Sequence, residues 1–221
     1  MILCQKEQIS EIRNDITKRF RQLGLQIHKE NNSSDKSTSG SLDYDAFSYL
    51  GYSFDEKVVS VRQGSIDNLR ESILSIFTGY KHSKLKSIEF LKWRLDLRIT
   101  GCIYEGKSKG WLYFFSEIDN ESLLHELDFF VESLCKRFGM PNLKLKKFTR
   151  AHFEIKHRRK ESKYMQNFDI YNEAQMKKVL DVFGKSTYNM TSKQIETEFK
   201  RRISKQVKEL ETDIQNAGST N

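Results

Sequence analysis

The chain has 221 residues, of which 37% are hydrophobic and 31% charged, and it carries a formal net charge of +8. This hydrophobic content is too high for a wholly disordered chain, and no apolar run approaches the ~20 residues needed to cross a bilayer. We therefore expect one or two globular domains, located in the cytoplasm and without a membrane partner. Three widely spaced cysteines, Cys4, Cys102 and Cys135, argue against a disulfide framework, and we expect them to be small buried residues.

The N-terminal part of the chain predicts one helix followed by strands. A stripe of apolar residues at helical spacing predicts a helix that ends at Gly24, and its members are Ile9, Ile12, Ile16, Phe20 and Leu23. A short half-buried strand is predicted over 25–28, and residues 31–41, which include no apolar residue, predict a flexible loop. Residues 47–54 and 58–62 are rich in aromatic and β-branched residues and predict the two strands of a hairpin.

The remainder of the chain predicts mostly helices. Helical periodicity predicts one helix from Ser65, as its N-cap, to Gly79, and another over 84–95. Residues 97–117 are interrupted by glycine and rich in β-branched and aromatic residues, which favours extended or irregular structure. Further helices are predicted as follows: one capped by Asp119 or Asn120 and ending at Gly139, one in the basic segment described next, one over 173–183, and a long last helix with the stripe Ile195, Phe199, Ile203, Val207, Leu210 and Ile214.

The positive charge is concentrated in one segment. Between Lys144 and Lys163, nine Lys or Arg residues accompany two Glu residues, which places +7 of the total charge of +8 in this segment. Clustered cations bind phosphates by releasing counterions, and interleaved aromatic residues can stack on bases; the alternative is a solvated helix face. The segment therefore predicts nucleic-acid binding, with these candidate residues: Lys144, Lys146, Lys147, Arg150, Lys156, Arg158, Arg159 and Lys160.

No pattern in the sequence predicts catalysis. The histidines and cysteines do not occur at metal-binding spacings, and His152 and His157 would point in different directions on a helix. Phosphate-loop and hydrolase motifs are absent from the sequence. Asp43 and Asp45 would face the same side of a strand, but two-metal chemistry needs further carboxylates. We therefore interpret this pair as solvated and His125 as structural, and we assign no catalytic residue and no metal ligand.

The order of elements in residues 1–62 resembles the downstream palm of bacterial reverse transcriptases of the retron, abortive-infection and antiphage-defence kinds. The resemblance rests on the apolar segment 1–4, the amphipathic helix, Leu-Gly-Leu-Gln-Ile-His at 23–28, the polar loop, and Phe-x-Tyr-Leu-Gly-Tyr-x-Phe at 47–54. In that family an aromatic-x-Asp-Asp turn, which holds catalytic carboxylates, runs directly into an apolar strand. The resemblance implies that this chain begins just after those carboxylates and is the C-terminal part of an RNA-directed DNA polymerase, inactive by itself.

The resemblance also implies roles for individual residues. The segment 47–54 would form the primer grip, through Phe47, Tyr49, Leu50, Gly51 and Tyr52. Gly24 and Lys29 would lie near the incoming nucleotide, although the family usually places a lysine where this chain has Asn31. The implied partners are an RNA or DNA template–primer and, for the intact enzyme, a dNTP, magnesium ions and the N-terminal part of the polymerase; no cofactor is implied for this chain itself.

We therefore expect an α+β fold in three units. These are a small antiparallel palm remnant with a primer-grip hairpin (1–62), a thumb and accessory helical region (63–140), and the basic element with the C-terminal helices (141–221). The alternative is a non-enzymatic helical module that binds nucleic acid or a protein, with its long last helix docked on a partner. A coding sequence for aromatic-x-Asp-Asp directly upstream of Met1 would favour the polymerase hypothesis.

Overall fold

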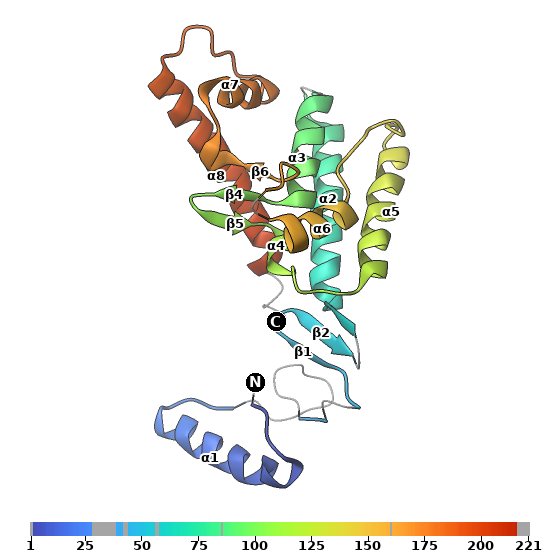
Figure 1. Ribbon diagram of the computed structural model, residues 1–221, viewed down its shortest axis with the longest axis vertical. Coiled ribbons are helices and arrows are strands. Elements are labelled where there is room, and N and C mark those ends of the chain that lie inside the picture. The colour runs from blue at the N-terminus through green and yellow to red at the C-terminus, as the bar shows by residue number, and fades with distance from the viewer. Residues whose placement is uncertain are drawn as a thin grey trace.

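The structure is a computed structural model that describes residues 2–27, 39–41, 44–55, 58–84, 86–159 and 161–215 (Figure 1). Its class is α+β: among these residues helices predominate and the strands form two three-stranded sheets. The first elements are η1 (Lys6–Gln8), α1 (Ile9–Gln22), β1 (Phe47–Tyr49), β2 (Tyr52–Asp55) and β3 (Val58–Val61). The helical body then comprises α2 (Gln63–His82), α3 (Ile88–Thr100), β4 (Cys102–Tyr104), β5 (Lys107–Lys109), α4 (Trp111–Phe114), α5 (Glu121–Arg137), α6 (Phe148–Arg158), β6 (Gln166–Asn167), η2 (Phe168–Ile170), α7 (Glu173–Val182) and α8 (Ser192–Gln215).

Helix α1 forms where the sequence predicts it, but its apolar stripe is only partly covered: Ile9, Ile12 and Ile16 are half-buried, and Phe20 and Leu23 are exposed. Gly24, with φ of 73°, follows the helix in the left-handed conformation that glycine adopts readily. No residue of α1 is buried, and in Figure 1 the helix lies apart from the helical body. The strand predicted over 25–28 is not formed at residues 25–27, which have no strand partner in the described chain. His28 and most of the predicted loop 31–41 lie outside the described residues.

The first sheet has three strands where the sequence predicts two. Leu50 and Gly51 have φ of 50° and 83°, so the chain reverses inside the segment 47–54, and Tyr49 pairs with Tyr52. Two left-handed residues are what a two-residue hairpin requires, because they match the twist of the strands. The sequence did not predict this turn, because leucine is rarely found in the left-handed region. The resulting sheet has the antiparallel order β1-β2-β3.

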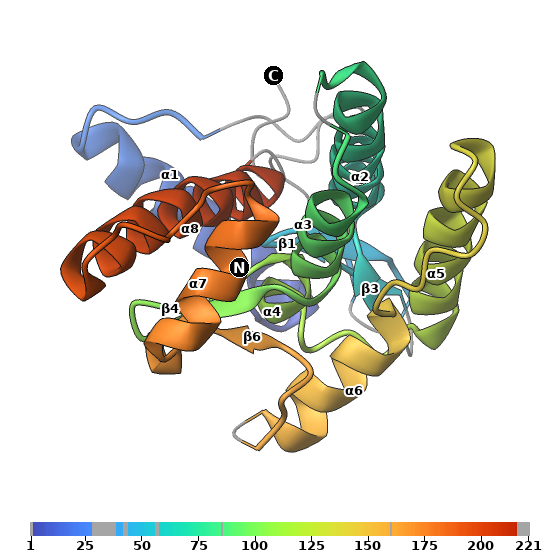
Figure 2. The same ribbon diagram turned by 90° about the horizontal axis from the view of Figure 1, so that it is seen from above.

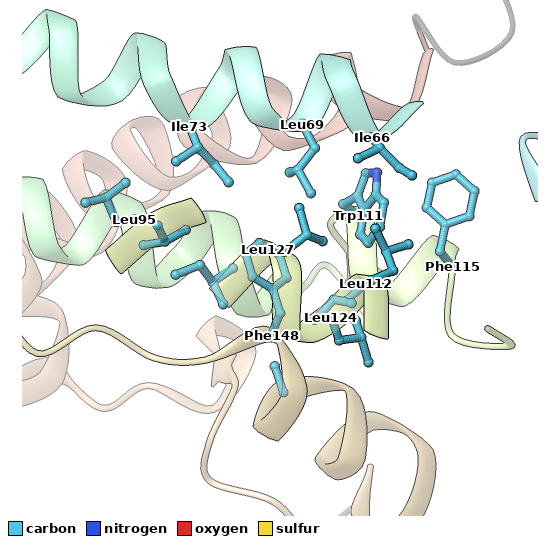
Figure 3. Packing of buried hydrophobic residues seen from close by; sticks show 14 of the residues in the cluster. Ile66, Leu69, Ile73, Leu95, Trp111, Leu112, Phe115, Leu124, Leu127 and Phe148 are labelled. Carbon is cyan, nitrogen blue, oxygen red and sulfur yellow. The ribbon is translucent and has the colours of Figure 1, made fainter. Parts of the chain in front are cut away.

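Helix α3 lies at the centre of the helical body. One of its sides contributes Leu95 to a cluster with α2, α4, α5 and α6, part of which Figure 3 shows, and another side contributes Trp93 and Leu97 to a second cluster with β4, α7 and α8. The apolar residues of α3 therefore lie on two sides, with charged residues such as Lys92 and Arg98 between them, so the helix lacks one-sided periodicity. The predicted helix over 84–95 therefore ended too early, and the segment 97–117, predicted to be irregular, begins inside α3.

The second sheet and α8 close the other side of the body. Strand β4 pairs with β5 antiparallel and with β6 parallel. The apolar stripe of α8 is buried in the second cluster, so this stripe stabilises the fold and is not free to dock on a partner. Buried Arg98 of α3 forms an ion pair with Asp213 of α8 and donates to the Glu209 carbonyl at 2.8 Å. Both clusters contain residues from before and after position 140, where the sequence predicts the boundary between the second and third units.

Several local expectations have clear outcomes. Asn120 caps α5, since its Oδ1 accepts from the Leu123 amide at 3.0 Å. Ser65 is not the N-cap of α2, because the helix begins at Gln63; Ser65 lies in its first turn and is buried. Two of the cysteines are buried as expected, whereas Cys4 is exposed. No helix in the described part of the chain combines the length and the apolar character that crossing a membrane requires.

Candidate nucleic-acid interface

The basic segment forms an extended stretch followed by α6, and neighbouring elements hold this helix in place. Its inner face packs in the first cluster through buried residues at helical spacing, namely Phe148, Ala151, His152 and Ile155. Asp128 of α5 caps its N-terminus: the carboxylate accepts from the Phe148 amide at 2.6 Å and from the Thr149 amide and hydroxyl at 3.3 and 2.7 Å. Helix N-termini present unpaired amides that favour a carboxylate, so Asp128 fixes the direction of α6.

The outer side of α6 combines cations with aromatic rings. Phe153 is 43% exposed, the His157 ring lies 4.9 Å from the Phe153 ring, and the Arg150 guanidinium lies 5.5 Å from the centroid of the same ring. Lys156 and Arg158 are exposed beside them. We call Arg150, Phe153, Lys156, His157 and Arg158 the α6 face. Such a face suits nucleic acid, since its cations can contact phosphates while its exposed ring stacks on a base.

A buried carboxylate pairs with Arg150 of this face. Glu154 is 4% exposed, forms an ion pair with Arg150, and lies one helical turn before Arg158. A hydrogen bond from Ser162, together with the charges of Arg150 and Arg158, lowers the pKa of Glu154 despite its burial. An open pocket of about 430 Å³ adjoins it, lined by Arg150, Glu154, Arg158, Glu161, Ser162, Lys163 and Tyr164. Glu154 therefore remains ionised and holds Arg150 at the edge of the pocket.

Lys146 is used inside the fold. Its ammonium donates to the Tyr164 carbonyl and lies 5.1 Å from the centroid of the Tyr164 ring, while its backbone amide donates to Asp96 at 2.8 Å. Burial lowers the pKa of Lys146. These contacts correct the sequence-based assignment of Lys146 to the phosphate-binding set, because its ammonium already has partners within the protein.

The other candidate cations differ in their surroundings. Lys144 is exposed. Lys147 pairs with Glu132 at 3.3 Å, with both side chains more than half exposed, so this pair contributes little to stability. Arg159 donates to the Ser108 hydroxyl at 2.9 Å and covers the Tyr113 ring, which fixes its position at the end of α6. Lys160 lies outside the described residues.

Three of the five predicted primer-grip residues hold the hairpin in place. Phe47 stacks on Phe54 with ring centroids 4.7 Å apart. Tyr52 donates its hydroxyl to the Phe114 carbonyl at 2.7 Å, and burial raises the pKa of Tyr52. A Cβ on Gly51 would lie 3.2 Å from the Phe115 ring, which explains why glycine suits this position beyond its positive φ.

The other two predicted primer-grip residues form the exposed tip of the hairpin. Tyr49 is 42% and Leu50 67% exposed. The segment 114–116 links this hairpin to α6, because Phe114 accepts from the hairpin and the Ser116 carbonyl lies 3.2 Å from Nε2 of His152 in α6. Burial lowers the pKa of His152. The hairpin and α6 thus pack on one short segment, with α4 between them in Figure 1.

The structure does not bring the remaining candidates to this interface. Gly24 lies at the end of α1, and Lys29 and Asp43 lie outside the described residues. Asp45 is exposed and accepts from the Ser41 amide at 2.8 Å. Within the described part of the chain, no group of three or more His, Cys, Asp or Glu side chains is placed to hold a metal ion.

Sequence reasoning missed two features of the interface. His157 joins Phe153 on the outer side of α6, and the four-residue spacing of the two rings on a helix was the signal that could have shown this. Asp128 caps a helix from another element, and no local pattern reveals such a contact.

Comparisons with protein-family models, with curated proteins and with solved structures each gave no match. The interpretation of this interface therefore depends on its own chemistry.

Proposed function

We propose that the chain binds nucleic acid without sequence preference through the α6 face, and that it is the C-terminal part of an RNA-directed DNA polymerase that holds a template–primer. The observation that carries the proposal is the α6 face itself, in which exposed cations surround an exposed aromatic ring on a helix fixed to the core. Phosphate contacts supply affinity without reading sequence, and stacking tolerates any base.

The polymerase part of the proposal is supported by the resemblance of residues 1–62 and by the hairpin whose tip exposes Tyr49 and Leu50. On this proposal the hairpin holds the end of the primer, α2 and its neighbours form the thumb, and Lys29 lies near the triphosphate. Magnesium ions would supply the alignment of primer hydroxyl and nucleotide in the intact enzyme. No described residue of this chain is assigned to hold them, so we expect no primer extension by the chain alone.

The nucleic-acid part is tested with two variants of equal charge. Lys156→Ala/Arg158→Ala removes two cations from the α6 face, and Lys205→Ala/Lys208→Ala removes two exposed cations from α8, which lies on the side of the molecule away from α5 and α6 in Figure 2. Fluorescence anisotropy with a labelled duplex at several salt concentrations gives the affinity and its salt slope. Each lost phosphate contact reduces the log–log slope by about 0.9, so the α6 variant should bind more weakly with a flatter slope. Equal behaviour of the two variants would remove the α6 face from the proposal.

The polymerase part is tested with Leu50→Asn. Asparagine tolerates the left-handed region better than leucine, so this change keeps the turn while removing the apolar tip. The parent chain should bind a recessed primer end more tightly than a blunt duplex, and Leu50→Asn should lessen that preference. Equal affinity of the parent for both ends would contradict a primer grip.

A second candidate function is a module for protein interaction, which the partly exposed apolar stripe of α1 favours, since no residue of that helix is fully buried. This alternative predicts that the α6 variant and the α8 control bind nucleic acid equally, and that apolar-to-polar changes at Ile12 and Ile16 remove a protein partner.

A further inference from the structure

A second group of exposed cations lies where α2 and α5 end and α3 begins. It comprises Lys81, Lys84, Lys86, Lys136 and Arg137, all exposed, and we call it the helix-end patch. Phe77 of α2 packs on Phe138 beyond α5 with ring centroids 5.2 Å apart, which places the last turns of the two helices side by side. Figure 1 shows α2 and α5 both running upward and ending away from the first sheet.

Helix stability does not account for the whole patch. Cations in the last turn of a helix interact favourably with its dipole, which explains Lys81, Lys136 and Arg137. Lys84 and Lys86, however, lie in the connection between helices. In the described part of the chain, none of the patch cations forms an ion pair with a carboxylate. Nearby Glu132 is paired with Lys147, and Glu89 in the first turn of α3 accepts from the Ser87 hydroxyl at 3.2 Å, so the five cations leave the patch with a net positive charge.

The basic segment connects the patch to the α6 face. The Lys144 carbonyl accepts from Lys92, near the start of α3, at 2.6 Å, and Lys147, beside the N-terminus of α6, reaches Glu132, which precedes Lys136 by about one turn on α5. Helical rise gives about 16 Å between Lys147 and Arg158 and about 8 Å between Glu132 and Arg137. When the side-chain contact between Lys147 and Glu132 is added, Arg158 and Arg137 are at most about 35 Å apart, which corresponds to about 10 base pairs of duplex.

We propose that the helix-end patch is a second phosphate-contact surface that holds the same nucleic acid as the α6 face. This inference rests on the proposed function and adds to it the length of ligand that engages both surfaces fully. A duplex of about one helical turn spans the whole path between them, whereas a stem of about 6 base pairs spans about 20 Å and covers little more than half of it. Affinity should therefore rise with duplex length in steps set by the two surfaces.

The test compares two ligands and three variants. The ligands are a loop-closed stem of about 6 base pairs and one of about 16 base pairs, both measured by anisotropy at several salt concentrations. Lys84→Ala/Lys86→Ala changes the patch outside any helix, so the fold should be retained, and circular dichroism checks this. Lys156→Ala/Arg158→Ala changes the α6 face, and Lys205→Ala/Lys208→Ala is the control of equal charge.

The patch variant should weaken binding of the long stem by up to about 60-fold at 0.1 M salt, with a slope flatter by up to about 1.8, and weaken binding of the short stem clearly less. A patch variant that weakens neither stem, or weakens both equally, overturns the inference. Anionic phosphatidylserine vesicles form another arm, and loss of vesicle binding with unchanged binding of the long stem would also overturn it. If the α6 variant binds like the parent while the patch variant is weakened on the long stem, the proposed α6 site fails and the patch stands.

Discussion

Replacing Asp128 with alanine removes the carboxylate that caps α6 from another helix. Asp128 is 9% exposed, and its two short hydrogen bonds are from the Phe148 amide at 2.6 Å and the Thr149 hydroxyl at 2.7 Å. After the change, the amide at the start of α6 would remain buried without its acceptor. The perturbation thus acts on the helix that carries the α6 face while leaving every residue of that face in place.

The expected loss of stability follows from these contacts. A hydrogen bond to a charged group contributes about 1.5–3 kcal/mol, and a buried donor left without a partner costs about 1–3 kcal/mol; loss of a helix N-cap alone costs about 0.5–2 kcal/mol. These effects overlap, so Asp128→Ala should lower the free energy of unfolding by about 2–4 kcal/mol. For a chain of this size that corresponds to a fall in Tm of about 5–15 °C.

Glu132→Ala is the matched control for this prediction. It lies one turn further along α5, loses the same charge and also breaks a contact with the α6 region, but its pair with Lys147 is more than half exposed on both sides. An exposed pair contributes less than about 1 kcal/mol. Urea unfolding followed by circular dichroism gives both free energies, and hydrogen exchange should show faster opening of α6 in Asp128→Ala alone. Equal losses in the two variants would refute the argument that burial makes the Asp128 cap strong.

Three further predictions concern two glycines, His152 and the segment 31–41. Gly51→Ala should destabilise the chain by about 1–2 kcal/mol, because Gly51 has φ of 83° and a Cβ there would press on Phe115. Gly79 lies in α2 with nothing near its Cβ, so Gly79→Ala should stabilise the chain by about 0.5–1 kcal/mol. Urea unfolding measures both changes. Burial lowers the pKa of His152 in the folded chain, so between that pKa and about 6.5 the unfolded chain binds more protons than the folded chain. The free energy of unfolding should therefore fall as the pH decreases below about 6.5 and level off below the folded-state pKa. His152→Gln should abolish this dependence. The polar composition of residues 31–41 predicts the earliest cuts in limited proteolysis, and first cuts elsewhere would contradict it.

How much of the fold could be predicted depended on how one-sided each element is. The stripes of α1, α5 and α8 face one direction, and these helices were predicted correctly. Helix α3 packs on two clusters through Leu91, Leu95 and Ile99 on one side and Trp93 and Leu97 on another, so no single apolar stripe marked where it ends. The turn at Leu50 was missed for a different reason: contacts of Tyr52 with Phe114 and of Gly51 with Phe115 stabilise a conformation that the local sequence disfavours.

The candidate interface could be predicted as a segment but not as a surface. Composition alone showed where the cations gather. Which of them point outward depends on partners far away in sequence, such as Tyr164 for Lys146 and Ser108 for Arg159. A lysine whose ammonium is bound within the fold and a lysine that faces solvent look alike in the sequence, and only packing distinguishes them.

This sorting of cations changes what the salt dependence of binding should be. If all the cations assigned from the sequence contacted phosphate, the log–log slope would be about −7. Lys146 is engaged inside the fold, and Arg150 and Lys147 each share their charge with a glutamate. Exposed Lys144, Lys156, Arg158 and Arg159 retain their charge for phosphate, and four contacts correspond to a slope of about −3 to −4 on a short stem. A longer duplex should steepen this slope only if the helix-end patch also contacts it, and the slope therefore reports how many cations the fold has left for the ligand.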